Sequence, residues 1–293
     1  MAHEIYQAIS DGILVGGVYA LMAAGLTLIF GVLDIINIAQ GILVVLGAYL
    51  SYVLAVHLHI DLFLGLLITV PALFMIGVVI HWTFIRPLRG RERTSMTLLV
   101  SYAVALIIEG ILYKVFGPNY TQLKSWYVSS TVHVLGFYLP YIYLFGFALA
   151  VALILALYLL LYQTGFGRSV RATMQDSTAA RLIGIDVNRV AALTFGIGVA
   201  VTAAGGMVFG ATSGGFNPNS GYDLISRLLA IIILGGLGSI AGALVASVFM
   251  LTLESLVTIW SPNWAVVVFY AALVVVLVLR PAGFLGRQAV RAQ

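Results

Sequence analysis

The sequence contains no cysteine, and charged residues make up only 8% of its 293 residues. The missing thiol excludes both a disulfide framework and a thiolate site. Soluble domains carry about a quarter of their residues as charged side chains, so this chain cannot cover a water-exposed surface of ordinary size. Because 62% of the residues are hydrophobic, the composition indicates an integral membrane protein. No polar stretch is long enough for a soluble domain, and we expect one transmembrane domain over residues 1–293.

Motifs for chemistry are also missing. No G-x-x-x-x-G-K-[ST] sequence is present, so the chain does not bind ATP through a P-loop. The five histidines have no carboxylate or cysteine cluster beside them to complete a metal site. No Ser–His–Asp or paired-carboxylate arrangement can be proposed. We therefore expect no catalytic residue, no metal and no cofactor, and a protein that is not an enzyme.

The positions of the arginines predict the topology. The net charge of +4 indicates orientation rather than nucleic-acid binding, because positive residues gather on the cytoplasmic side of membrane proteins. The three clusters are Arg86, Arg89, Arg91 and Arg93; Arg168, Arg171, Arg181 and Arg189; and Arg280, Arg287 and Arg291. With apolar runs of about 20 residues between them, they predict an all-α bundle of about eight spans. Its N-terminus is outside and its C-terminus is cytoplasmic. Helices are expected near 62–84, 96–116, 139–162, 190–212 and 263–280, with 117–138 external.

Two segments must each cross the membrane twice, and 224–260 has too few residues for two full spans. Residues 11–56 are predicted to break at GVLDIINIAQG, and 224–260 at the glycine turn GGLGSIAGA. Two broken or re-entrant helices, one in each half, are typical of a transport pathway. The pathway candidates are Asp34, Asn37, Gln40, Gly235, Gly236 and Gly238. The alternative is that the polar groups cap half-helices and satisfy freed backbone groups, an interpretation that we favour for Asn37.

Other single residues carry weaker expectations. Glu109 is expected to hydrogen-bond a neighbouring helix, Glu254 to face water, and Arg227 to pair with Asp223 one turn away. Small residues recur every four positions, which predicts close helix packing within the bundle; a subunit interface is the alternative. These ladders are Gly12, Gly16, Ala20 and Ala24; Gly198, Thr202, Gly206, Gly210 and Gly214; and Gly238, Gly242 and Ala246.

The basic loop 163–189 is compatible with helix and mixed in polarity. It is either a surface helix held by anionic membrane lipid or a docking helix for a cytoplasmic partner, and composition leaves both open.

Four stretches in order carry a resemblance: GGVYALMAAGLTLIFGVLDIINIAQG, GRSVRATMQDSTAARLIGID, GGLGSIAGAL and LRPAGFLGR. Together they resemble the LivH-type membrane permease subunits of branched-chain amino acid ABC importers, from about Gly12 to Arg287. The chain departs from that family's pattern at Ile38, where Phe is usual, and at Gln40, where His is usual.

The resemblance implies the permease half of an importer in the bacterial inner membrane. It implies a second permease subunit, commonly a longer paralogue in a heterodimer, two cytoplasmic ATPase subunits and a periplasmic substrate-binding protein. The substrate would be a branched-chain amino acid or a related small polar solute. The loop 163–189 would be the element that couples to the ATPases. Its residues of interest are Arg168, Arg171, Asp176, Ala179, Ala180 and Gly184.

Two other classes of function remain open. An ion-coupled secondary transporter would use broken helices with an embedded acidic residue, for which Asp34 and Glu109 are candidates. A passive channel for a small solute such as urea is the other alternative.

Overall fold

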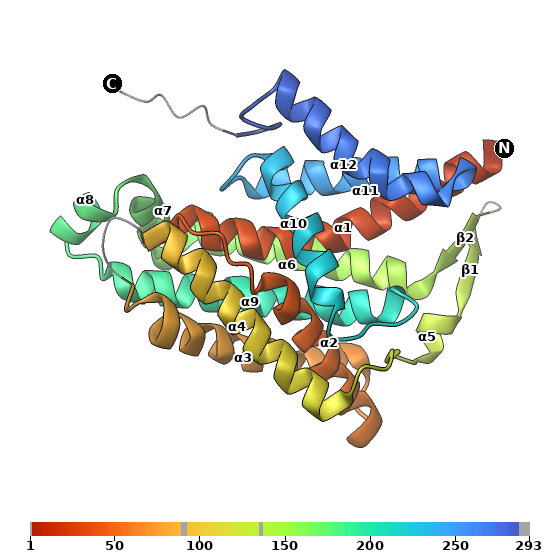
Figure 1. Cartoon of the computed structure of the whole chain (residues 1–293), viewed down its shortest axis with the longest axis horizontal. Helices are drawn as coiled ribbons and strands as arrows, with labels where there is room; N and C mark the ends of the chain where they lie inside the picture. Colours follow the sequence, from red (N-terminus) through yellow and green to blue (C-terminus); the bar gives the residue numbers. More distant parts are fainter. Residues whose placement is uncertain (1, 89–92, 135–136, 287–293) are drawn as a thin grey trace.

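The protein, described here by a computed structural model over residues 2–88, 93–134 and 137–286, is a helical bundle (Figure 1). Eight helices within this part of the chain are long and apolar enough to cross a membrane. They are α1 (Ala2–Leu33), α2 (Gln40–His57), α3 (Leu62–Ile80, continued by a π-helical turn over His81–Ile85), α4 (Arg93–Phe116), α6 (Tyr141–Gln163), α9 (Val187–Thr212), α11 (Ile240–Trp260) and α12 (Pro262–Leu279). The expected all-α bundle and its five individually predicted helices are confirmed. Arg89, Arg91, Arg287 and Arg291 of the predicted basic clusters lie outside the described residues.

Both predicted interruptions are present. The long helix α1 ends at Leu33 and α2 begins only at Gln40. Asp34 adopts a left-handed backbone with φ of 54°, a conformation that stops a helix of L-residues. In the second half, α10 (Ser220–Gly235) has only 16 residues. Gly236 and Gly238 then turn the chain with φ of 98° and 82°, values that glycine adopts without steric cost.

The two ends of the bundle differ in structure. At one end α5 (Trp126–Ser129) precedes an antiparallel hairpin of β1 (Thr131–Val134) and β2 (Phe137–Pro140), and α1 starts beside it (Figure 1). Two short helices, α7 (Gly165–Gln175) and α8 (Ser177–Leu182), lie at the opposite end (Figure 1). The expected external segment and the expected cytoplasmic loop are therefore at opposite ends of the molecule.

The hairpin end is fastened to the bundle at three points. The Gln7 side chain of α1 donates to the Tyr138 carbonyl oxygen at 2.7 Å. Thr121 and Phe216 form an isolated β-bridge. The hydroxyl of Tyr127 donates to the Asp61 carboxylate at 2.8 Å, and this carboxylate also accepts the Phe63 N–H as the N-cap of α3.

Small residues allow the helix backbones to approach closely. A Cβ added to Gly16 of α1 would lie 2.8 Å from the Cα of Val248 in α11. One added to Gly206 of α9 would collide with the Val44 carbonyl of α2, and one at Gly198 with the Gly25 carbonyl of α1. The prediction of packing within the bundle is confirmed for these positions, because each contact is inside one chain.

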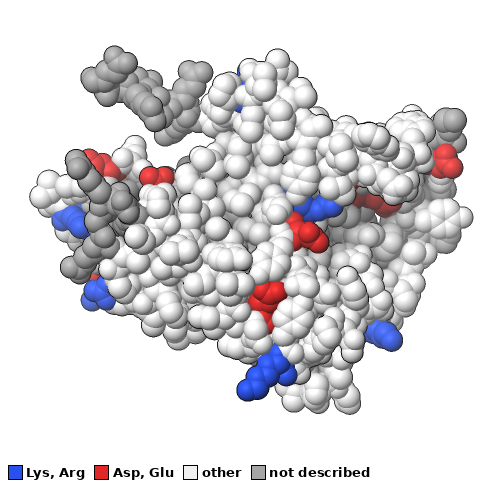
Figure 2. Space-filling view, viewed as in Figure 1, with Lys and Arg blue, Asp and Glu red and all other residues white. Residues whose placement is uncertain are grey.

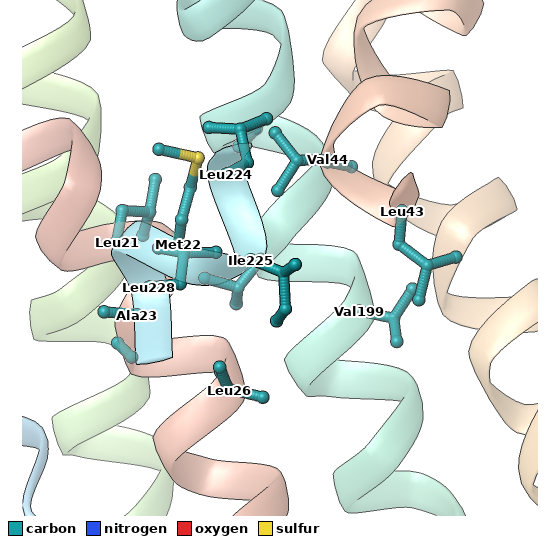
Figure 3. Close-up of a cluster of buried hydrophobic side chains, with 14 of the residues drawn as sticks. Leu21, Met22, Ala23, Leu26, Leu43, Val44, Val199, Leu224, Ile225 and Leu228 are labelled. Atoms are coloured by element: carbon teal, nitrogen blue, oxygen red, sulfur yellow. The ribbon is translucent and has the colours of Figure 1, made fainter. Parts of the chain in front are cut away.

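Apolar side chains fill the centre where α1, α2, α9 and α10 meet (Figure 3). Leu21 and Leu26 of α1, Val44 of α2, Val199 of α9 and Leu228 of α10 are buried together there. Removing a buried Leu from such a core costs about 2–5 kcal/mol. This core holds the short helices α2 and α10 against the full-length helices α1 and α9.

Candidate functional site

The first helix break is held by a buried network of amides. Gln40 donates from its side-chain nitrogen to the hydroxyl of Thr202 in α9, and the Thr202 hydroxyl donates to the Gly198 carbonyl at 2.8 Å. The Asn37 amide donates to the Gln40 side-chain oxygen at 2.9 Å. Asn37 and Gln40 are 1% and 0% exposed. These two side chains therefore hold the break to α9 in this conformation and do not border an open space.

A second contact fixes the same segment from the other side. The backbone N–H of Ile38 donates to the Ser101 hydroxyl of α4 at 3.2 Å. Because the segment between α1 and α2 is not helical, such partners satisfy backbone groups that hydrocarbon would leave unpaired. Asp34 differs from Asn37 and Gln40, since its side chain is exposed.

The second break is closed by a part of the chain that we did not expect there. The N–H groups of Phe284 and Leu285 donate to the carbonyl oxygens of Leu234 and Gly235, at 2.7 and 3.1 Å. They satisfy carbonyls that are freed where α10 ends. The approach is so close that a Cβ at Gly283 would lie 2.6 Å from the Leu234 oxygen. The segment after α12 is therefore the cap of the glycine turn, a role that its sequence alone did not indicate.

The two breaks meet beside one large cavity. A Cβ added to Gly31, near the end of α1, would lie 3.7 Å from the Cα of Gly238 in the glycine turn. A cavity of about 1810 Å³ opens at this junction, and Asp34, Gly238 and Arg171 contribute to its lining. Of the predicted pathway residues, Asp34 and Gly238 line this cavity, whereas Gly235 packs tightly against Gly242 of α11.

The predicted coupling residues all fall in the α7–α8 pair or directly after it. Asp176 is the N-cap of α8 and accepts from the N–H groups of Thr178 and Ala179, at 2.7 and 3.0 Å. Arg171 donates to the Leu161 carbonyl of α6 and stacks over the Tyr162 ring at 4.9 Å. Ala180 is buried, and Gly184 turns the chain after α8 with φ of 86°. Arg168 and Ala179 are exposed.

Two apolar side chains at the tip of α8 were missed by the sequence reasoning. Leu182 and Ile183 are 85% and 75% exposed, although they lie in the basic loop at the α7–α8 end of the molecule. Their position beside Ala179, Ala180 and Gly184 in the basic loop was the available signal. Contiguous exposed apolar side chains can mark an interaction surface.

The helix α7 also touches the end of α1. A Cβ added to Gly31 would lie 2.5 Å from the terminal methyl of Met174 in α7. A displacement of α7 would therefore act directly on α1, three residues before the break at Asp34.

Two expectations about charged residues were wrong. Arg227 of α10 does not pair with Asp223; it makes a bidentate pair with Glu254 of α11, at 2.6 and 2.8 Å. Glu254 does not simply face water, since its side chain is only 15% exposed and that of Arg227 only 21%. Burial explains the difference, because a partly desolvated guanidinium gains more from a two-pronged buried carboxylate than from an exposed one. Arg227 also stacks over Phe269 of α12 at 5.3 Å.

The expectation for Glu109 is confirmed. The hydroxyl of Tyr222, in the first turn of α10, donates to its carboxylate at 2.6 Å. The bond joins α4 to α10; the Tyr222 side chain is exposed and that of Glu109 is half-buried.

A polytopic helical bundle with a break in each half, both ending at one cavity, defines a membrane transport protein. Residues 8–277 match the protein family described as "Branched-chain amino acid transport system / permease component". The chain belongs to this family and is a multi-pass protein of the inner membrane.

Individual relatives agree with the family. The chain is 30% identical to the high-affinity branched-chain amino acid transport system permease protein LivH of Salmonella typhimurium, over 96% of this chain and 95% of the relative. It is 28% identical to the corresponding permease protein BraD of Pseudomonas aeruginosa, over 97% of each chain. A shorter match, 34% identical over 40% of this chain and 36% of the relative, is with the autoinducer 2 import system permease protein LsrC of Klebsiella pneumoniae. No solved structure matches the chain.

Proposed function

We propose that the chain is one permease subunit of an ABC importer that moves a branched-chain amino acid across the membrane. The cavity carries this proposal, because it joins the two helix breaks to the α7–α8 pair. Asp34 and Gly238 border the pathway at the cavity, and Gly236 supplies the turn that shapes it. Asn37, Gln40 and Gly235 act indirectly, by holding the broken helices in place.

The α7–α8 end is the cytoplasmic end in this proposal, which places the N-terminus and the hairpin outside. The described basic residues at that end support this orientation, because they include Arg86, Arg168 and Arg181. The external hairpin end, fastened to α1 and α3, is the surface that receives a substrate-binding protein. The whole chain forms a single transmembrane domain, paired with a second and paralogous permease subunit.

Energy comes from two separate ATPase subunits that bind the α7–α8 pair. Leu182 and Ile183 insert into the apolar groove of an ATPase subunit, and the exposed Arg168 of α7 meets acidic groups of its rim. The contact between Met174 and Gly31 transmits movement of α7 to the first break. The chain itself has no nucleotide site in this scheme and is not an enzyme.

The test reconstitutes the chain with the second permease and the ATPases encoded beside it. Liposomes containing the assembly receive the binding protein and labelled leucine, with or without internal ATP. Uptake that requires both ATP and the binding protein is the expected result. Uptake driven by a proton or sodium gradient without ATP would contradict the proposal in favour of a secondary transporter. Solute flux through the chain alone would favour a channel.

A second measurement isolates the coupling surface. The double variant L182S/I183S removes two exposed apolar side chains, which should change stability by less than about 0.5 kcal/mol. We expect it to fold normally but to lose the ATPase subunits on purification. A matched control is L279S, since Leu279 at the end of α12 is also highly exposed but lies outside the proposed contact. Retention of the ATPases by L182S/I183S would reject this docking surface.

A further inference from the structure

The helix α10 presents polar side chains on its outer surface in the middle of the bundle. It crosses the middle of the molecule, between the hairpin end and the α7–α8 end (Figure 1). Tyr222, Asp223 and Ser226, here called the polar face of α10, are all exposed. In Figure 2 charged side chains adjoin one another over α10, on a surface that is otherwise mostly white.

Such a face is poorly suited to lipid. Ionisable residues within membrane-spanning regions are costly in hydrocarbon and are almost always turned toward a water-filled cavity or the protein interior. The neighbouring helix α12 shows what an apolar environment selects. Its exposed large side chains between Val266 and Val278 are all valines, namely Val266, Val267, Val274, Val275 and Val278. Two helices that lie side by side therefore face different surroundings, and water is the medium that suits α10.

The polar face of α10 also leads to the cavity. Tyr222, Ser226, Leu229 and Ile233 follow one another at spacings of three and four residues, which places them on one side of the helix. Leu237 lies beyond the end of α10, directly after the turn at Gly236. Leu229 and Ile233 are half-buried and apolar, and Leu237 lines the cavity. The stripe thus runs from exposed polar groups through an apolar middle to the cavity beside Asp34 and Gly238. This order suits a solute with a charged head and an apolar side chain.

Asp223 carries the carboxylate of this face, and no cation among the described residues forms an ion pair with it. Within residues 2–88, 93–134 and 137–286, no donor hydrogen-bonds it. The nearest cation along the helix, Arg227, directs its two terminal nitrogens to Glu254 at 2.6 and 2.8 Å. Asp223 lies in the first turn of α10. An exposed carboxylate that accepts no hydrogen bond from the described residues attracts a cationic group.

We propose that the polar face of α10 lines the water-filled pathway and that Asp223 on it binds the ammonium group of the passing amino acid. The inference rests on the proposed transport function and assigns a substrate contact within it. The opposite wall of the pathway is then the second permease subunit, because one chain leaves this face uncovered.

The absence of cysteine allows a direct test of the polar face. The single-cysteine variants S226C, on the polar face, and V274C, on the exposed side of α12, are treated in the complete transporter with a charged, membrane-impermeant methanethiosulfonate reagent. That reagent needs a thiolate, which forms only in contact with water. We expect S226C to react in the native assembly and V274C to react only after denaturation. An S226C thiol that reacts no faster than V274C would overturn the proposal.

A second experiment tests the charge of Asp223. At saturating binding protein, D223N should reduce the rate of ATP-driven leucine uptake about tenfold, the effect of losing one charged hydrogen bond. D223E keeps the carboxylate and should restore most of the rate. Leucine uptake by D223N at the parental rate would reject Asp223 as the ammonium contact.

Two further readouts separate this inference from the proposed function. Co-purification of the ATPase subunits with the parental chain, and ATP hydrolysis by the parental assembly stimulated by the binding protein, test the proposed function alone. If the parental chain itself shows neither, the proposed function fails. If both persist while D223N transports normally, only the inference about Asp223 fails.

Discussion

Gln40 of α2 and Thr202 of α9 are hydrogen-bonded at the first helix break, and both side chains are completely buried. The bond ties the start of the short helix α2 to the middle of α9. It lies directly after the non-helical segment that separates α1 from α2. Position 40 is where the permease family that this sequence resembles usually has histidine. We therefore expect the Gln40 side chain to act on the shape of the break and not by direct contact with a solute.

The first prediction concerns this bond. The variant T202V removes the hydroxyl and leaves the Gln40 amide without its main partner in a buried site. We expect the free energy of unfolding to fall by about 1–3 kcal/mol, the cost of one unsatisfied buried polar group. Thermal unfolding in detergent measures it. Q40A should cost a similar amount, and the two effects should not add in Q40A/T202V. Full additivity of the two losses would show that the side chains do not act as a pair.

The same network predicts the behaviour of Q40H. An imidazole can donate to Thr202 and accept from Asn37, as the present amide does. We therefore expect Q40H to restore most of the stability that Q40A loses, and to leave the preference among branched-chain amino acids unchanged. Competition between labelled leucine and unlabelled analogues in the reconstituted importer measures that preference. A changed order of competition would show that position 40 contacts the solute.

The helix breaks could be predicted from sequence, whereas the buried ion pair could not. Polar residues within a long apolar run, together with the arginine clusters, required a break near Asp34 and another at the glycine turn. The pairing of Arg227 depends on how α10 and α11 are rotated toward each other, and Glu254 is far from it in sequence. A rule for residues one turn apart can only find Asp223. Which carboxylate wins is decided by burial, which a sequence does not show.

The role of the segment after α12 was hidden for the same reason. Its LRPAGFLGR sequence carried only a resemblance to the family, and its partners are the carbonyls of Leu234 and Gly235. Backbone hydrogen bonds between distant segments leave no side-chain pattern. The glycines at 236 and 283 were visible, but not that their backbones meet.

The buried ion pair gives the next prediction. The variant E254Q leaves the partly buried Arg227 guanidinium without a counter-charge, and we expect a loss of about 3 kcal/mol in the free energy of unfolding. Replacing both partners, in R227M/E254Q, removes the unpaired charge and should recover much of that loss. A loss below about 1 kcal/mol in E254Q would indicate that Arg227 turns to Asp223 instead. The variant D223N/E254Q would then show the full cost.

The cap of α8 predicts an effect on coupling. In D176A, two backbone N–H groups lose their acceptor, which costs about 1 kcal/mol of local helix stability. We expect the importer to assemble but to hydrolyse more ATP for each leucine imported, because the α7–α8 pair is less rigid. D176N is the matched control, since asparagine caps a helix about as well as aspartate. The ratio of ATP hydrolysis to uptake, measured in the same liposomes, distinguishes the variants. An unchanged ratio in D176A would mean that the cap has no part in coupling.

The last prediction concerns pH and the hairpin end. Burial of the phenol, which is 3% exposed, and its hydrogen bond to Asp61 raise the pKa of Tyr127 to about 12. The unfolded chain releases this proton near pH 10, so it holds fewer protons than the folded chain between about pH 10 and pH 12. The contribution of Tyr127 to stability is therefore complete below about pH 10 and is lost as the pH rises through that window. Y127F should be about 1 kcal/mol less stable at neutral pH and should lack this part of the alkaline loss. Melting temperatures of Y127F and the parent between about pH 10 and pH 12 measure the difference. If the two melting temperatures fall in parallel with pH, the Tyr127–Asp61 bond does not hold α5 against α3.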